Sequence, residues 1–326
     1  MGRPLRHFEP GIPQFITSRC FQGRYLLKPS KEVNKIIGGI LARAVEQYDI
    51  ELYSFVFTSN HFHLLAKGPD KNPCLISNFV GYLKSNISKE LSRLDDRKWQ
   101  GTFFDRRFSA EPVLDDEAMQ GRLQYILSHG VKEGLVSKVE DWPGLSSLPE
   151  HLGVEREFSW QDRTAWYHML GSKKGLEVPV INYSLKISKL PMWKNEAQET
   201  IKDQISQLIN EINSESSTQV FGVNKLLAQN PKDMPKDIQR IARPLCHASS
   251  PDLYEEYKRR YEEFVSEYRQ ISFDFRKGDV GVEFPPHSFR PAPPAEWQGI
   301  LYRLKKPQLI KLEPKDAGYE GTIQAA

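Results

Sequence analysis

Two histidines, His61 and His63, are separated by a single phenylalanine in a stretch of β-forming residues. On a strand, successive side chains point to opposite faces, so both imidazoles share one face and Phe62 points to the other. Two neighbouring imidazoles can bind a divalent metal when a third ligand comes from elsewhere in the fold. The alternative is a polar sheet face without a metal, which is the commoner meaning of an isolated pair of this kind.

Tyr125 and His129 lie four residues apart in a segment with helical periodicity. That spacing places both side chains on one face of a helix, with Arg122 beside them. We expect this face to point away from the core, so the tyrosine is free to react. The alternative is an amphipathic tyrosine at the surface or in an interface. The expected core stripe of this helix consists of Met119, Leu123, Ile126 and Leu127.

Together these residue types suit phosphodiester transesterification. A divalent metal polarises the scissile phosphate and stabilises its developing charge. A free tyrosine has a pKa of about 10, but a nearby cation favours its phenolate. Attack by tyrosine keeps the bond energy in a covalent phosphotyrosine. A hydrolase would instead need a carboxylate to activate water, and none lies in this motif.

The elements that must position these residues follow the order β-α-β-β-α-β-α. That order predicts an α+β fold with a ferredoxin-like (split βαβ) sheet and one added helix that carries the tyrosine. Asp115 and Asp116 offer an N-cap for this helix, and Gly130 is suited to the position just after its end. Strands are expected over 13–21, 50–58, 61–67 and 103–114, and helices over 31–48, 74–93 and about 115–130.

After about residue 150 the periodicity weakens. We therefore predict a domain over 1–150, followed by a mainly helical C-terminal region over 151–326 whose role is not assigned. Helices are expected over 195–213 and 252–270, and the proline-rich stretch 285–295 is expected to be irregular.

The net charge of the chain is only +3, with 45 Lys and Arg against 42 Asp and Glu in 326 residues. The charge is not evenly spread. Residues 1–114 hold 17 basic and 11 acidic side chains, a difference of +6, which leaves −3 for the rest. A basic N-terminal segment is compatible with a polyanionic partner. The near-neutral net charge of the whole chain therefore does not exclude nucleic-acid binding.

Three separated cysteines form no CxxC pair. A disulfide framework or a thiolate zinc site is therefore not expected, and a cytoplasmic, reducing location is the simplest prediction. No stretch approaches 18 apolar residues and the first residues lack the apolar region of a signal peptide, so we expect no membrane association.

Three motifs in this order resemble one protein family. Phe57-Thr-Ser-Asn-His-Phe-His-Leu-Leu65 is similar to the HUH signature (His, bulky hydrophobic, His) of the Y1 transposases of the IS200/IS605 type. Leu123-Gln-Tyr-Ile-Leu-Ser-His-Gly-Val-Lys-Glu-Gly-Leu-Val136 resembles the tyrosine helix of REP-associated tyrosine transposases. Trp99-Gln-Gly-Thr-Phe-Phe-Asp-Arg-Arg-Phe108 resembles the segment that links the two motifs in that subfamily. The resemblance covers roughly residues 10–148.

The resemblance implies an HUH domain that cleaves and rejoins single-stranded DNA next to imperfect hairpins with Mg²⁺ or Mn²⁺. Tyr125 matches the nucleophile, which forms a 5′-phosphotyrosine and frees a 3′-OH. His61 and His63 match the metal ligands. His129 matches the polar residue that completes the coordination, usually the amide of an Asn-Pro pair; here the pair is His129-Gly130. A third nitrogen ligand favours Mn²⁺ or a later transition metal over Mg²⁺.

Basic and aromatic side chains near these motifs are candidates for holding phosphates or stacking an unpaired base, although solvated surface charge explains any one of them equally well. A basic N-terminal arm could grip a hairpin. A homodimer, in which the tyrosine serves the partner's site, is left open. The candidate DNA contacts are Arg3, Arg6, Lys84, Lys98, Trp99, Arg106, Arg107 and Arg122.

Two further functions are compatible with the residues. One is a domesticated protein that binds hairpin DNA with weak or vestigial catalysis, which the His129-Gly130 pair motivates. The other is a metal phosphodiesterase that acts on RNA or nucleotides through an activated water.

Overall fold

A computed structural model describes residues 4–163, 166, 178–215, 219–236 and 243–293 of the chain. The chain divides into two compact units, residues 1–263 and 264–326, and the long helix α7 (Pro251–Lys277) belongs to both. The predicted boundary near residue 150 stays a prediction. Among the described helices, none is long and apolar enough to cross a membrane.

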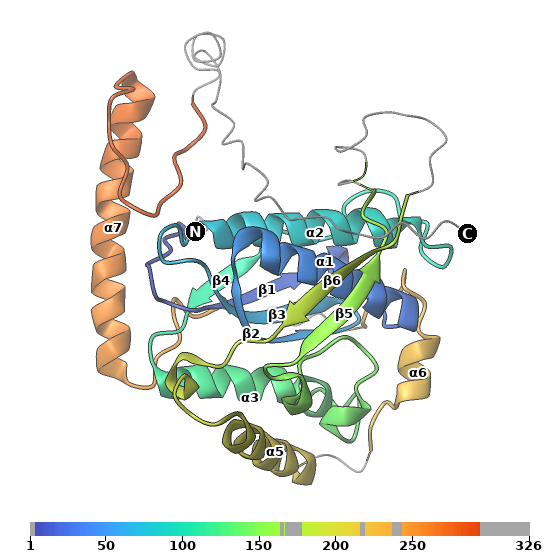
Figure 1. Cartoon of the computed structure of the whole chain (residues 1–326). Helices are drawn as coiled ribbons and strands as arrows, with labels where there is room; N and C mark the ends of the chain where they lie inside the picture. The colour runs from blue at the N-terminus through green and yellow to red at the C-terminus, as the bar shows by residue number, and fades with distance from the viewer. Residues whose placement is uncertain (1–3, 164–165, 167–177, 216–218, 237–242, 294–326) are drawn as a thin grey trace, which may run out of the picture. The chain divides into compact units, whose positions relative to one another are not determined.

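Four antiparallel strands form the central sheet of the first unit in the order β2-β3-β1-β4. Together with two helices, α1 and α2, they follow the chain order of a ferredoxin-like fold, so the predicted fold class is confirmed. In Figure 1, α1 and α2 lie on one side of this sheet and α3 on the other. The strands are β1 (Gln14–Arg19), β2 (Glu51–Phe57), β3 (His61–Lys67) and β4 (Ser109–Pro112), and the helices are α1 (Lys31–Tyr48), α2 (Leu75–Arg93) and α3 (Asp116–Lys132).

The helix that carries the tyrosine, α3, begins as predicted but ends later. The carboxylate of Asp115 caps it by accepting a hydrogen bond of 2.8 Å from the backbone N–H of Ala118. The expected end at Gly130 is wrong, because the helix continues to Lys132. Gly134, with φ of +63°, follows the C-cap residue instead. Gly130 serves close packing: a Cβ there would lie 3.1 Å from the Trp142 ring.

An unpredicted pair of antiparallel strands, β5 (Glu155–Trp160) and β6 (Ile181–Lys186), packs against α1. The C-terminal region is therefore not helical throughout, although the predicted helices are present. These are α5 (Gln198–Ser214) and α7; a short helix that was not predicted, α6 (Val223–Ala228), lies between them in the chain. Single 3₁₀ turns occur at Phe21–Gly23, Val139–Asp141, Pro149–His151 and Pro191–Trp193. The stretch 285–293 is irregular, as expected, and residues 294–295 lie outside the described residues.

Two adjacent glycines of α1 allow the close approach of β5. A Cβ on Gly38 would lie 2.1 Å from the Phe158 ring, and one on Gly39 would lie 2.5 Å from the Trp160 Cβ. The Trp160 Cβ is attached directly to the strand backbone, so it cannot move aside without moving the strand. Gly39 therefore fixes the distance between the helix and this second sheet.

Gly39→Ala is expected to lower the free energy of unfolding by about 1–3 kcal/mol, because the added methyl overpacks this contact. Urea denaturation followed by circular dichroism measures it. The matched control is Gly81→Ala on α2, where an added Cβ has nothing within 4 Å. There the helix propensity of alanine should leave stability unchanged or raise it by up to about 1 kcal/mol. Equal stability of the two variants would contradict the packing role of Gly39.

The described part of the second unit, residues 264–293, consists of the end of α7 and an irregular segment that folds back on it. The Phe284 ring lies 5.4 Å from the Tyr268 ring and 5.7 Å from the Phe275 ring. The Tyr268 hydroxyl donates a hydrogen bond of 2.7 Å to the Phe289 carbonyl. A small aromatic core therefore holds this segment in place.

Candidate active site

Strand β3 places His61 and His63 on the sheet face that α3 covers. The predicted alternation is confirmed, because Phe62 is fully buried on the opposite face against Phe57 and Phe104. The neighbouring strand β1 pairs Arg19 with His61 and Thr17 with His63. The register of the sheet therefore surrounds the two imidazoles with side chains that the sequence motif does not contain.

Hydrogen bonds to the Nδ1 atoms orient both rings. The Nδ1 of His63 lies 2.8 Å from the Thr17 hydroxyl. The Nδ1 of His61 lies 2.6 Å from the Asn60 side-chain oxygen and 2.9 Å from the Thr58 hydroxyl. An amide oxygen can only accept, so the His61 Nδ1 carries the proton and its Nε2 has a free lone pair. This is the arrangement that metal-binding histidines use, with one nitrogen held and the other available.

The third imidazole comes from α3. One ring nitrogen each from His61, His63 and His129 lies within 4.8 Å of the others, and the Nε2 atoms of His61 and His129 are only 2.8 Å apart. The Nε2 of His63 is buried and has no hydrogen-bond partner among the described residues. A buried nitrogen without a partner is costly unless something binds it, so the donor set fits a divalent metal.

The protonation states of the three histidines also suit a metal. Burial lowers the pKa of all three, and it lowers that of His129 to about 4. Mutual repulsion adds to this effect for His61 and His63, whereas Lys132 and Arg19 add to it for His129. The imidazoles are therefore neutral near pH 7, and only a neutral imidazole can coordinate a metal.

Tyr125 lies beside this cluster. Its ring contacts His63 edge-on with 5.3 Å between centroids, and it lies 5.6 Å from Phe15 and 5.5 Å from His129. Burial raises the pKa of the phenol, and Glu133 adds to this, whereas Arg122 and Arg19 lower it. Tyr125 therefore holds its proton at neutral pH in the chain without a metal.

The expectation that the Tyr125–His129 face points away from the core is wrong. His129 is only 3% exposed and Tyr125 is half-buried, since this face lies against the sheet. The apolar stripe is also buried, and α5 packs against α3. Helix α3 is therefore buried on two sides, whereas one buried side and one exposed side were predicted from the sequence.

Further charged residues near the site come from the end of the first unit. The Glu111 carboxylate on β4 lies 3.4 Å from the His247 Nε2 and 3.8 Å from the Arg243 guanidinium. His247 also pairs with the backbone of β4 beside Val113, and its ring lies 5.5 Å from that of Phe15. Sequence reasoning missed this group, because no motif links residues more than a hundred positions apart.

Three of the candidate DNA contacts donate to backbone carbonyls, and two of these three lie against buried phenylalanine rings; nearby, the exposed Arg106 pairs with Asp105 at 3.4 Å. Arg6 lies 3.6 Å from the centre of the Phe108 ring and donates to its carbonyl, and burial together with Arg107 lowers the pKa of Arg6 to about 9. Lys84 donates to the Arg106 carbonyl, and its ammonium nitrogen lies 5.3 Å from the centre of the Phe104 ring. Burial, and to a lesser extent the charge of Arg6, lowers the pKa of Lys84 to about 8. Arg107 donates to the Pro4 carbonyl.

The other candidates lie apart from these four. Lys98 is exposed and pairs with Asp95, and the Trp99 indole donates to Thr102. Arg122 lies over the rings of Phe15 and Tyr125 at 5.5 and 5.3 Å. Arg3 lies outside the described residues. The assignment of all eight residues to DNA stays a prediction.

The N-terminal part of the chain thus combines a ferredoxin-like sheet, which carries the His61-Phe62-His63 pattern, with an added helix that carries Tyr125. Residues 22–129 match the family model described as transposase IS200 like, which confirms the resemblance over this segment. A relative from Haemophilus influenzae, named as a candidate REP-associated tyrosine transposase, is 28% identical over 124 residues, or 36% of this chain and 68% of the relative.

Two solved structures are also similar. One is a REP-associated tyrosine transposase bound to a REP hairpin, at 18% identity and a TM-score of 0.40, covering 46% of this chain and 85% of that one. The other is a candidate transposase from Deinococcus radiodurans R1, at 16% identity and a TM-score of 0.27, covering 40% of this chain and 95% of that one.

Proposed function

We propose that this chain is a metal-dependent tyrosine transposase that cleaves and rejoins single-stranded or hairpin-forming DNA. Residues 1–150 would form its catalytic domain, acting in the cytoplasm. The observation that carries the proposal is the convergence of three neutral imidazoles, from His61, His63 and His129, beside the phenol of Tyr125.

The three histidines would hold Mg²⁺ or Mn²⁺, and three nitrogen ligands favour Mn²⁺. A divalent ion bound there supplies a Lewis acid for the scissile phosphate. Thr17 and Asn60 keep the Nε2 atoms of His63 and His61 directed into the site by holding their Nδ1 atoms. Strand β1, the turn between β2 and β3, and helix α3 therefore together pre-organise the ligand set.

In the proposed reaction, the phenol oxygen of Tyr125 attacks the phosphorus of a DNA phosphodiester. A new bond joins this oxygen to the 5′-phosphate, and the bond from phosphorus to the 3′ oxygen breaks. The phenol loses one proton and the leaving 3′ oxygen gains one, so no water is consumed. The freed 3′-OH can reverse the reaction, which is what strand transfer requires.

Side chains around Tyr125 fit this role. Burial raises the pKa of the phenol, and the charges of Arg122 and Arg19 partly offset that rise, so the metal would have to supply the remaining stabilisation of the phenolate. Contacts with Phe15 and His63 hold the Tyr125 ring beside the histidine cluster. Arg122 is also placed to contact a phosphate that reaches Tyr125.

The DNA partner is proposed from the family match, since a relative of similar fold is bound to a REP hairpin. The candidate contacts on this chain are the exposed Lys98 and Arg106, with Trp99 for an unpaired base. The internally bonded Arg6, Lys84 and Arg107 would have to exchange their present partners for DNA. A homodimer remains compatible with this reaction.

The test is adduct formation. Purified chain, incubated with Mn²⁺ and a hairpin oligonucleotide carrying a single-stranded flank, is expected to give a covalent protein–DNA band that survives boiling in SDS. Chelation of the metal should prevent the band. Tight hairpin binding without any adduct, at every metal tested, would favour a protein with vestigial catalysis instead. Turnover without a covalent intermediate would point to a hydrolase.

A further inference from the structure

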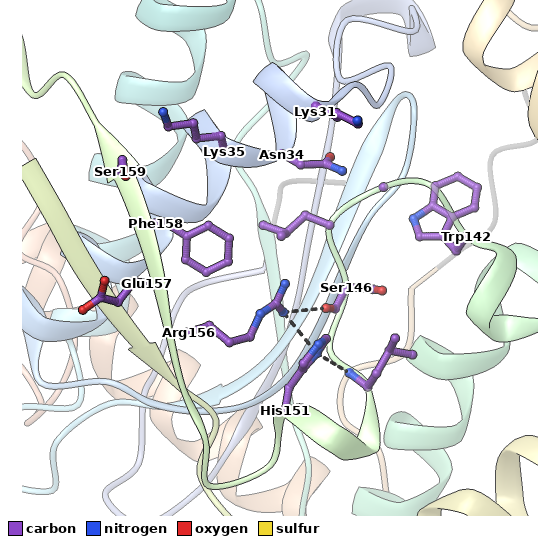
Figure 2. A pocket seen from close by; sticks show the side chains of 13 residues that line it. Lys31, Asn34, Lys35, Trp142, Ser146, His151, Arg156, Glu157, Phe158 and Ser159 are labelled. Carbon is purple, nitrogen blue, oxygen red and sulfur yellow. Dashed lines mark hydrogen bonds between the residues drawn. The ribbon is translucent and has the colours of Figure 1, made fainter. Parts of the chain in front are cut away.

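A pocket of about 540 Å³ lies between the start of α1, the segment 142–148 and strand β5 (Figure 2). Segment 145–147 runs along the outer edge of β2, because Phe57 and Ser147 exchange backbone hydrogen bonds with Leu145 and Phe55. Most of the lining therefore lies beyond residue 129, where the family match ends. The histidines and Tyr125 are not part of it.

Three cations line this pocket, and none of them forms an ion pair with a described residue; Glu150, outside the lining, is near enough to Arg156 to favour its charged form. Lys31 and Lys35 lie on the first turns of α1 and form no ion pair with any described residue. Arg156 enters from β5, and its charge is likewise not paired with a described carboxylate. The positive end of the α1 dipole adds to their field. Unpaired cations around a concave space favour an anionic ligand.

Glu157 is the one acidic residue among the described residues of the lining, and its carboxylate does not point into the pocket that the three cations line. Strand alternation directs Arg156 and Phe158 towards α1 and Glu157 to the opposite face of β5. Figure 2 shows the Glu157 carboxylate pointing away from the other labelled side chains. The Phe158 ring lies against Gly38 of α1, in agreement with this alternation.

Arg156 is held in place by neutral partners. One of its terminal nitrogens donates to the Ser146 carbonyl at 3.3 Å and to the His151 Nδ1 at 3.1 Å. The same Nδ1 accepts the Leu148 backbone N–H at 3.1 Å, so it carries no proton. The other two guanidinium nitrogens make no hydrogen bond within the described part of the chain. They are free to form the paired contact that arginine makes with a phosphate.

An aromatic surface completes the pocket. The Phe158 ring is half-buried, and the Arg156 guanidinium carbon lies over it at 5.1 Å from the ring centre, so a stacked base would share the ring with this guanidinium. Asn34, which is anchored to the Pro143 carbonyl at 2.8 Å, fixes the opposite wall. A flat ring next to phosphate-binding cations is the combination that binds a nucleotide, since the base stacks while the phosphate is held.

We propose that this pocket binds a nucleotide, with its phosphate against Lys31, Lys35 and Arg156 and its base against Phe158. The proposal does not rest on the function proposed above, because it uses neither the histidines nor Tyr125. The nucleotide could be free or part of a DNA strand, and both present the same chemistry to the pocket.

The test uses the full chain carrying Tyr125→Phe in EDTA, so that no reaction at the histidines contributes. Isothermal titration calorimetry with deoxyadenosine 5′-monophosphate, deoxyadenosine and a five-nucleotide oligo-dA is expected to show that binding requires a phosphate. The double variant Lys31→Glu/Lys35→Glu should lower the affinity at least about tenfold. The matched control Lys89→Glu, on the exposed side of α2, should leave it unchanged.

A second variant distinguishes the contribution of base stacking to the affinity from that of phosphate binding. Phe158→Leu keeps an apolar side chain against Gly38 but removes the ring, so it should weaken nucleotide binding and leave inorganic phosphate unaffected. Equal affinity of mononucleotide and oligonucleotide would identify a free nucleotide as the ligand; binding of the oligonucleotide alone would identify a DNA strand. No binding of either, or binding that Lys31→Glu/Lys35→Glu does not weaken, would overturn the proposal.

Discussion

Tyr125→Phe is expected to abolish the covalent protein–DNA adduct, with a loss of at least about a thousandfold in the rate of strand cleavage. The substitution removes only the hydroxyl that would attack phosphorus. The ring stays, and with it the edge-on contacts to His63 and Phe15. The histidine cluster and the packing of α3 should therefore be preserved, so the loss measures chemistry rather than folding.

The measurement is a single-turnover cleavage assay with a labelled hairpin substrate, accompanied by a hairpin-binding titration. Binding should stay within about twofold of the unmodified chain, because the hydroxyl contributes little to holding DNA. Tyr48→Phe is the matched control: Tyr48 is also half-buried with a raised pKa, but it packs against Tyr82, away from the histidines. Cleavage by Tyr125→Phe at the unmodified rate would exclude Tyr125 as the nucleophile.

Local periodicity and capping predicted the order of the elements in the ferredoxin-like fold, although the fourth strand spans only Ser109–Pro112 instead of 103–114. Helix α1 spans Lys31–Tyr48 as expected, because Ser30 caps its first turn and apolar residues recur at helical spacing. The strands β5 and β6 were not predicted. Their position depends on the contact of Phe158 and Trp160 with two glycines more than a hundred residues earlier, and such a contact leaves no local periodicity.

At the candidate site too, contacts between residues far apart in the chain could not be predicted from the sequence. The alternation of His61, Phe62 and His63 could be predicted from strand geometry, but the partners of the imidazoles could not. Thr17 contacts His63 only because β1 and β3 adopt one particular register, which the hydrophobic pattern does not specify to the residue. The burial of His129 was also missed, since it follows from the packing of its face of α3 against the histidines of β3.

Loss of one imidazole from the cluster is expected to have the second large effect. His63→Ala should lower the affinity for Mn²⁺ at least about a hundredfold, because two nitrogen ligands remain of three. In the unmodified chain, Mn²⁺ at a hundred times its dissociation constant should raise the free energy of unfolding by about 2.7 kcal/mol. At the same concentration this stabilisation should nearly vanish in the variant, together with adduct formation.

Calorimetric titration with Mn²⁺ and thermal unfolding with and without the metal distinguish this effect from a folding defect. His151→Ala is the control, since the His151 ring contacts Arg156 in the other pocket and is not one of the three clustered imidazoles. Without metal the variant should also lose some stability, because the substitution leaves a cavity beside Phe15 and Tyr125 and removes the partner of the Thr17 hydroxyl. The diagnostic quantity is therefore the change that Mn²⁺ makes to the stability of each variant. Metal ligation by His63 predicts that Mn²⁺ no longer stabilises the His63→Ala variant. Retained stabilisation by Mn²⁺ would show that His63 is not a ligand.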